Sequence, residues 1–193
     1  MILIHEQYTS PDPARAAELA NVRELNAAAG VFTEIVPLAD GGRKSFADFF
    51  RLAAERFPGE VCVVANADIA FDESLGGAAA LLRAWPQPLL VALSRWDDPA
   101  GPSMEGRVDP KRWRFYSHSQ DTWLFVAGGL PTFEAGFTLG VPACESRLAH
   151  EAFRAGVSVL NPALSVRTWH HHASGTRTWK HADAYRGPLY FPG

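Results

Sequence analysis

Residues 61–72 read VCVVANADIAFD, an apolar run that leads directly into polar and acidic residues. The first five, Val61–Ala65, are small or β-branched, which is typical of a strand buried on both faces of a parallel sheet. Asn66 and Asp68 follow two positions apart, so in an extended chain both side chains point the same way. Because α/β proteins bind ligands outside the carboxyl ends of their strands, this stretch predicts a binding site. An ordinary turn stabilised by Asx side chains is the alternative.

Strands and helices alternate along the chain on both sides of this stretch. The apolar patterns predict further strands at residues 1–4, 31–38, 89–93, 157–160 and 164–169, and another within 119–126. They predict helices over residues 14–29, 45–58, 75–84 and 144–155, with Ser10 or Asp12, Ser45 and Ser74 as N-caps. This order predicts an α/β fold in a single domain over residues 1–193, with a mostly parallel central sheet and helices on both faces.

The composition is that of a globular protein without a marked charge. The chain of 193 residues has a formal net charge of −3 and scattered Lys and Arg, so no nucleic-acid partner is expected. No apolar stretch is long enough to cross a membrane, and residues 1–4 are too short for a signal peptide. Cys62 and Cys144 lack a CxxC spacing and are expected to be buried free thiols. These observations predict a cytoplasmic protein without a membrane span.

Polar residues also lie at the ends of other predicted strands. The polar loop of residues 5–13 follows the first strand and is expected to line a ligand crevice. Asp97 and Asp98 follow a second apolar strand, and Asp121 lies at the start of another. Arg15 lies near the start of the first predicted helix. Its side chain is expected to face solvent, but from this position it could also reach a phosphate. Two carboxylate groups past two strand ends favour a common site.

Two features near the end of the chain carry further chemistry. Residues 170–172 are three consecutive histidines at the end of the last predicted strand. Because neighbours on a strand point to opposite sides, only His170 and His172 can share one side. Glu145 lies in the first turn of the last helix, where the helix dipole alone would favour an acidic residue. Residues 173–193, rich in Arg, Lys, Tyr and Trp, are either a cover over the site or a loose tail.

The ordered set of these features resembles the GT-A fold of nucleotide-sugar glycosyltransferases. Residues 66–68 (NAD) are at the position of the acidic D-x-D motif, and residues 136–140 at that of a glycine-bearing loop. Glu145 is at the position of the acid that opens the following helix, and residues 170–172 at that of the C-terminal histidine. More narrowly, the peptides NADI, SRWD, SQDTWLF and NPAL are similar to a set of glycosyltransferase-like proteins. The resemblance covers residues 1–172 and implies a Rossmann-like GT-A domain.

The resemblance implies transfer of a sugar from a nucleotide-diphosphate donor to a glycan or other hydroxyl acceptor, in bacterial glycan synthesis. It implies Mn²⁺ or Mg²⁺ held by Asp68 and Asn66 with His170 and His172, although the neutral Asn66 would weaken the affinity for metal.

The same resemblance implies a carboxylate base for the acceptor hydroxyl. Glu145 is the first choice for this base and Asp121 the second. Asp97 and Arg15 are expected to contact the donor. Trp96 or Trp123 would stack on a sugar ring, unless they pack in the core or an interface.

Two other functions fit the same residues. A metal-dependent hydrolase of phosphate esters or nucleotide sugars would use Asp68, Asp72, His170 and His172 as ligands and activate a water. A non-catalytic carbohydrate- or nucleotide-binding module is favoured by Asn66 in place of an acid. Fold alone does not choose among the three functions.

Overall fold

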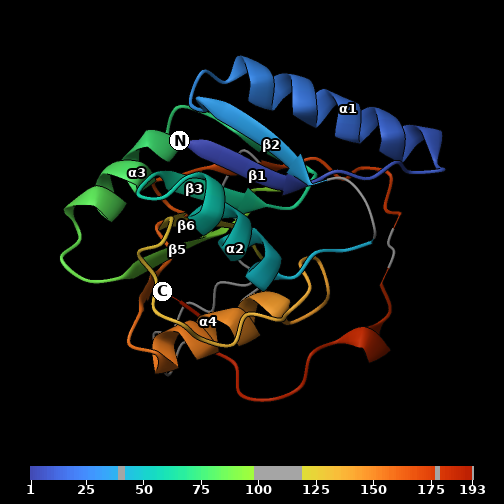
Figure 1. The fold of residues 1–193 in the computed structure, drawn as a ribbon. Helices are drawn as coiled ribbons and strands as arrows, with labels where there is room; N and C mark the ends of the chain where they lie inside the picture. Colours follow the sequence, from blue (N-terminus) through green and yellow to red (C-terminus); the bar gives the residue numbers. More distant parts are fainter. Residues whose placement is uncertain (39–41, 98–118, 177–178, 193) are drawn as a thin grey trace.

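The computed structural model describes residues 1–38, 42–97, 119–176 and 179–192, which form a central sheet between helices (Figure 1). The six strands of this sheet are β1 (Ile2–Glu6), β2 (Glu34–Leu38), β3 (Val61–Ala65), β5 (Leu89–Ser94), β6 (Gln120–Val126) and β7 (Ser158–Leu160). Their spatial order is β2-β1-β3-β6-β5-β7, and within the described residues only β6 runs against its neighbours in this sheet. The predicted α/β class with a mostly parallel sheet is confirmed.

Helices cover both faces of this sheet (Figure 1). They are α1 (Pro13–Ala28), α2 (Phe46–Arg56), α3 (Leu75–Ala84) and α4 (Cys144–Arg154), with a short 3₁₀ helix at His181–Asp183. α2 and α4 pack on one face, where Phe46, Phe49 and Leu148 belong to one apolar cluster. α3 packs on the other face, where Leu75 and Leu82 belong to a second cluster. The sheet therefore has an apolar core on each side.

The surroundings of β3 explain why its sequence is apolar at every position. Cys62 and Val64 point to the α2 and α4 face, whereas Val61, Val63 and Ala65 point to the α3 face. Side chains alternate between the two faces of a strand, and here each face is covered by helices. All five are at most 1% exposed, so β3 is buried on both faces as predicted.

A second, two-stranded sheet lies beside the central one. It pairs β4 (Ile69–Phe71) with β8 (Thr168–His170) in antiparallel register, with Ile69 opposite His170. The strand predicted over residues 164–169 begins only at Thr168, because residues 162–166 form a turn in which the Pro162 carbonyl accepts from the Val166 N–H at 3.0 Å. The pairing with β4 brings two segments about a hundred residues apart to the same place.

The α1 helix packs against this second sheet. The amide of Asn26 donates to the Ile69 carbonyl at 2.9 Å and accepts from the Phe71 N–H at 3.0 Å. The buried residues of α1 recur at intervals of three and four, which places them on one face of the helix. These are Arg15, Leu19, Val22 and Asn26.

Two of the predicted helix caps are present and one is not. Asp12 accepts from the N–H of Ala14 at 2.9 Å and caps α1. Ser45 and Asp48 form a reciprocal capping box at the start of α2. Ser74 makes no side-chain cap for α3, because its hydroxyl accepts from the backbone N–H of Arg167 at 2.8 Å. That serine connects the start of α3 to the segment before β8.

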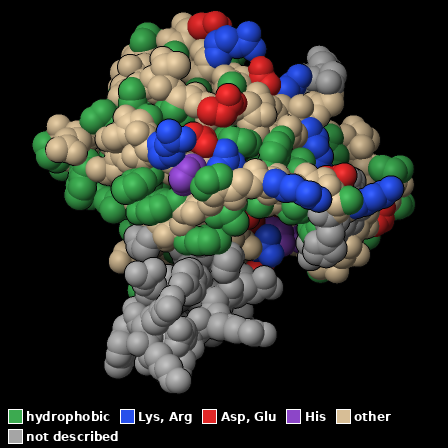
Figure 2. Space-filling view, turned by 90° about the horizontal axis from the view of Figure 1, so that it is seen from below, with side chains coloured by type: hydrophobic (Ala, Val, Ile, Leu, Met, Phe, Trp, Pro, Cys, Tyr) green, Lys and Arg blue, Asp and Glu red, His purple; other side chains and the backbone are tan. Residues whose placement is uncertain are grey.

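Figure 2 shows one face of the molecule, on which Lys and Arg are spread among acidic and hydrophobic side chains and do not form one patch. Cys62 and Cys144 are buried free thiols, as predicted. Among the described residues, no helix has both the length and the apolar content needed to cross a membrane.

Candidate functional site

The carboxyl ends of β1, β3 and β5 meet the amino end of β6 at one edge of the central sheet. Because β6 is reversed, Thr122 pairs with Ala65 at the end of β3 and Gln120 pairs with Ser94 at the end of β5. This register places Asp121 beside the carboxyl ends of both β3 and β5. A cavity of about 860 Å³ lies at this edge, and residues 6–9 after β1 line it. Cavities that bind small molecules have volumes of about 300–1,000 Å³.

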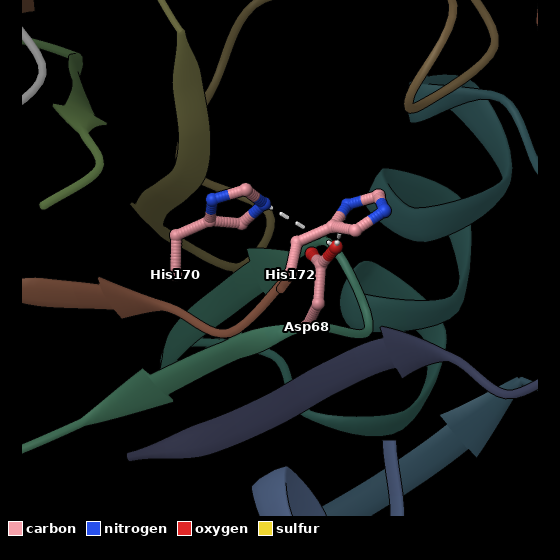
Figure 3. A group of neighbouring side chains, drawn as sticks. All are labelled: Asp68, His170 and His172. Atoms are coloured by element: carbon pink, nitrogen blue, oxygen red, sulfur yellow. Dashed lines mark ion pairs between the residues drawn. The ribbon is translucent and has the colours of Figure 1, made fainter. Parts of the chain in front are cut away.

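Asp68 and Asn66 lie between β3 and β4 in a turn, not in extended chain. The Asn66 carbonyl accepts from the N–H three residues later at 3.3 Å, so the prediction that both side chains share one side of a strand was wrong. The amide of Asn66 donates to Asp121 Oδ1 at 2.8 Å. Asp68 is 6% exposed and faces His170 and His172 (Figure 3).

The β8 strand and the loop after it place both histidines beside Asp68. His170 Nε2 lies 3.5 Å and His172 Nδ1 lies 3.4 Å from Asp68 Oδ2 (Figure 3). His171 uses its backbone, because its N–H donates to the Asp68 carbonyl at 2.8 Å. The structure thus brings His170 and His172 together on one side, as the alternation of neighbouring side chains predicted.

Both histidines are oriented by acceptors on their outer side. His170 Nδ1 lies 2.6 Å from Asp97 Oδ1, and His172 Nε2 lies 2.9 Å from the Thr176 carbonyl. A carboxylate and a carbonyl only accept hydrogen bonds, so these outer nitrogens carry the protons. The inner nitrogens, Nε2 of His170 and Nδ1 of His172, face Asp68 and are the atoms that a metal would bind. Such outer acceptors are typical of histidines that ligate a metal.

The group formed by Asp68, His170 and His172 fits a divalent cation. The three ligand atoms lie within 4.8 Å of one another. Two ligand atoms about 2.1 Å from one ion and a tetrahedral angle apart are separated by about 3.4 Å, which is close to both nitrogen–oxygen separations. Two imidazoles and one carboxylate that leave coordination positions open form a known site for divalent transition metals.

Arg15 is part of this site, which corrects the expectation that it faces solvent. The side chain is buried on α1, and its Nη2 donates to Asp68 Oδ2 at 2.5 Å. Nη1 donates to Glu18 Oε2 at 2.9 Å and to the His171 carbonyl at 3.1 Å. The guanidinium therefore connects α1, the turn after β3 and the segment after β8.

The surroundings of Asp68 keep its carboxylate ionised. Burial alone would raise the pKa of Asp68, but hydrogen bonds with His170, His172 and Arg15 hold that pKa well below its ordinary value. Burial opposes the charged form of His170, yet the Asp68 carboxylate raises the pKa of that histidine above its ordinary value. The Asp68 end of the cavity is thus a carboxylate held by Arg15 and two histidines.

Asp121 has both of its oxygens engaged. Oδ1 accepts from Asn66, and Oδ2 accepts from Arg95 Nη1 at 2.9 Å. Burial raises the pKa of Asp121, and the charge of Arg95 opposes that effect. Arg95 also donates to Asp97 Oδ1 at 3.1 Å. Arg95 therefore links Asp121 to the carboxylate that holds His170.

Glu145 faces the same cavity from the first turn of α4. Burial raises the pKa of Glu145 to about 7, the Asp121 charge adds to this effect, and hydrogen bonds from its own N–H and the Cys144 thiol oppose it. The N-cap of this helix is Ala143, which has a left-handed φ of 65° and makes no side-chain cap. A strained residue near a desolvated carboxyl is a combination common at functional sites.

Gly140 brings the loop before α4 close to another cavity residue, Arg43. Its φ is +75°, and a Cβ at this position would lie 2.8 Å from Arg43 Nη1. Arg43 Nη1 also donates to the Leu139 carbonyl at 3.2 Å. The positive φ favours glycine here, whereas the Arg43 guanidinium is the end of a flexible side chain that can move away from a Cβ.

Other candidates from the sequence lie elsewhere. Asp72 pairs with Arg167 at 2.9 Å and accepts from Trp169 Nε1 at 3.0 Å, so it does not belong to the Asp68 group. Trp123 is 0% exposed and belongs to the apolar core, which rules out stacking on a sugar. Trp96 packs edge-on against Trp169. Asp98 lies outside the described residues.

The segment after the histidines lies against the cavity and α1. Ser174 donates from both its N–H and its hydroxyl to Glu18, at 2.6 and 2.9 Å, and the Thr176 hydroxyl donates to Asp12 Oδ2 at 2.6 Å. Thr176 and Trp179 line the cavity. Further on, the Tyr190 N–H donates to the Ser146 carbonyl of α4 at 3.1 Å. The described residues of this segment therefore contact α1, α4 and the cavity wall.

Sequence reasoning assigned no role to Arg95 or Thr176, and it covered Tyr8 only as part of the loop over residues 5–13. Arg95 holds Asp97 and Asp121, Thr176 orients His172, and the Tyr8 hydroxyl accepts from Arg15 Nη2 at 3.3 Å. The position of Arg95 directly after a buried strand was a usable signal. No sequence pattern indicated Thr176, because its contribution is a backbone carbonyl.

The sequence matches no protein-family model and no curated protein. Among solved structures, the fold is similar to the crystal structure of a glycosyltransferase involved in the glycosylation of the major capsid of PBCV-1. That likeness has 12% identity and a TM-score of 0.47, and it covers 91% of this chain and 94% of the other. At this level it carries no argument about activity, which rests on the geometry of the site.

Proposed function

We propose that the protein is a glycosyltransferase that moves a sugar from a nucleotide-diphosphate donor to a hydroxyl acceptor. One observation supports this proposal most: a single cavity is lined both by the Asp68, His170 and His172 group and by Glu145, whose pKa is raised to about 7. Sugar transfer needs both parts. The diphosphate leaving group needs positive charge, and the acceptor hydroxyl needs a base.

The Asp68 end suits the leaving group. Asp68, His170 and His172 would hold the divalent cation, and Asn66 stays a predicted oxygen ligand. The ion, when bound, supplies Lewis-acid stabilisation of the diphosphate charge. Two imidazole ligands favour Mn²⁺ over Mg²⁺, which prefers oxygen ligands and retained waters. Asp97 would act through His170, because it lies 2.6 Å from Nδ1 of that ring.

Glu145 suits the acceptor. A base works best when its pKa lies near the working pH, and burial raises the pKa of Glu145 to about 7. Asp121 is the weaker candidate, because Asn66 and Arg95 already occupy its two oxygens. The negative charge of Asp121 instead helps to keep Glu145 a strong base.

A screen of nucleotide-diphosphate sugars tests the proposal. Release of the nucleoside diphosphate is measured with Mn²⁺, with and without a panel of saccharide acceptors, on the wild-type protein and on Glu145→Gln. We expect acceptor-dependent release from one donor, and loss of that release in the variant. Equal release without acceptor favours a hydrolase. Failure of every nucleotide to bind, with and without Mn²⁺, would contradict the donor site.

A non-catalytic binding module predicts a different result. In that case a nucleotide or saccharide binds, but no sugar is transferred and Glu145→Gln changes nothing measurable. The raised pKa of Glu145 favours an enzyme over this function. Desolvation of the carboxyl disfavours its ionised form, and a site that only binds a ligand gains nothing from that.

A further inference from the structure

Three groups that can carry positive charge converge on one oxygen atom. Arg15 Nη2 donates to Asp68 Oδ2 at 2.5 Å, and His170 Nε2 and His172 Nδ1 lie 3.5 and 3.4 Å from the same atom. The Arg15 and Asp68 side chains are only 5% and 9% exposed, so water screens this pair little. Asp68 Oδ2 is therefore the charge centre of this end of the cavity.

A divalent cation bound by both histidines needs that same oxygen. It would lie about 2.1 Å from Oδ2, on the side where the histidine nitrogens converge. The guanidinium already forms a short hydrogen bond to Oδ2, and like charges a few ångströms apart repel strongly in a buried site. Full bonding of Asp68 Oδ2 to Arg15 and to the cation at once is therefore unfavourable.

The other contacts of Arg15 would survive the loss of Asp68. Nη1 is held by Glu18 and by the His171 carbonyl, neither of which involves Asp68 Oδ2. Nη2 also donates to the hydroxyl of Tyr8, and both Arg15 and Tyr8 line the cavity. Arg15 thus keeps three partners if Nη2 leaves Asp68.

We propose that Arg15 and a divalent cation compete for Asp68 Oδ2, and that the cation turns the Nη2 edge of Arg15 into the cavity, where it binds a phosphate oxygen. This inference rests on the metal site of the proposed function. Arg15 then has two opposite effects. It weakens the binding of the metal, and it strengthens the binding of the diphosphate once the metal is present. Metal binding before donor binding follows from this coupling.

Titration of Mn²⁺ by calorimetry tests the competition. An alternative contact that occupies a site nine-tenths of the time lowers the apparent affinity about tenfold, so Arg15→Gln is expected to bind Mn²⁺ about tenfold more tightly than the wild type. Arg43→Gln is the matched control, because Arg43 lines the same cavity but donates to the Leu139 carbonyl. It removes one charge from the cavity and is expected to change the Mn²⁺ affinity less than threefold.

Inorganic pyrophosphate at saturating Mn²⁺ tests the second effect. Arg15→Gln is expected to bind pyrophosphate about tenfold more weakly than the wild type, the opposite sign to its effect on Mn²⁺. Equal pyrophosphate affinity in both proteins, or no pyrophosphate binding by the wild type, overturns the role of Arg15 toward phosphate.

A second variant guards against misfolding of Arg15→Gln. Arg15→Lys keeps the positive charge but loses the guanidinium, which donates from Nη1 and Nη2 to different partners. This variant is expected to bind Mn²⁺ with an affinity between those of the wild type and Arg15→Gln. A second measurement uses the wild type alone, so it does not depend on the folding of a variant. It follows the arginine Nε–H signals in ¹H–¹⁵N spectra while Zn²⁺ is added. One signal, which is absent in Arg15→Lys, is expected to shift, and an unchanged spectrum at saturating Zn²⁺ overturns the inference.

Two different failures can be told apart. If neither the wild type nor Arg15→Gln binds Mn²⁺, the metal site of the proposed function is wrong. If the wild type binds Mn²⁺ and Asp68→Asn does not, the metal site stands. In that case an Arg15→Gln affinity equal to or below that of the wild type overturns the competition alone.

Discussion

Asp68 and Glu145 face the same cavity, yet their surroundings move their pKa values in opposite directions. Burial disfavours the charge on both. Around Asp68, hydrogen bonds with His170, His172 and Arg15 overcome that effect and lower the pKa well below its ordinary value. Around Glu145, burial dominates and raises the pKa to about 7. The comparison teaches that neighbouring groups, not residue type, set whether a carboxylate in this cavity holds its charge or its proton.

The largest expected effect is that of Glu145→Gln on transfer. General-base catalysis contributes about 10²–10⁴-fold, so we expect kcat to fall about a thousandfold. The wild-type rate should rise with pH and level off above about 7, since the base acts only when ionised and burial raises its pKa to about 7. Steady-state kinetics from pH 5 to 9 checks both expectations. A rate that does not change with pH, or a fully active variant, would assign the base elsewhere.

The next effect separates the histidines. Loss of a first ligand is expected to weaken Mn²⁺ binding at least as much as loss of an outer partner, which costs about 10–100-fold. We therefore expect His172→Gln to lower Mn²⁺ affinity about a hundredfold. His171→Gln is the matched control, because the contacts described for His171 come from its backbone. Equal losses in both variants, measured by calorimetry, would mean that histidine content and not geometry binds the metal.

A stability measurement tests the Glu145 environment without substrate. Its pKa is raised to about 7 from an ordinary 4.5, so the folded state binds the proton more tightly than the unfolded state. The resulting stabilisation is complete below about pH 4.5 and is lost as the pH rises through about 7. We expect Glu145→Gln to be more stable than the wild type by about 3 kcal/mol at pH 8, and not at pH 4.

Urea unfolding at both pH values checks this sign. Glu151→Gln, which loses an ion pair with Arg147 on the same helix, should not show the same gain at pH 8. A variant that is less stable than the wild type at pH 8 would mean that Glu145 is ionised at little cost, and its surroundings would then resemble those of Asp68.

The smallest effect concerns Asp97, which accepts from Arg95 and lies against the outer nitrogen of His170. Loss of an outer hydrogen-bond partner weakens metal binding about tenfold at the low end. We expect Asp97→Ala to lower Mn²⁺ affinity by that amount without changing the number of sites. Glu73→Ala is the control, because its side chain is 85% exposed and the charge change is the same. Equal affinities of the two variants would leave Asp97 without a role in the metal site.

Much of the fold followed from local patterns. The β3 residues are apolar and the α2 cap is a local Ser45–Asp48 pair, so both were visible in sequence. The alternation of side chains along a strand also predicted that His170 and His172 point to the same side. Ser74 was misassigned as a cap, because its hydroxyl accepts from the Arg167 N–H about ninety residues away. Residues 164–167 were misassigned as strand, because residues 162–166 form a turn.

The positions of Asp68, Glu145, His170 and His172 along the chain could be read from residue type and spacing, since hydrophobic alternation and helix starts depend on near neighbours. Their chemical states could not. The low pKa of Asp68, the raised pKa of Glu145 and the burial of Arg15 arise where segments 53 to 156 residues apart exclude water around a few charges. Desolvation and charge pairing depend on distance in space, so the folded chain alone sets them.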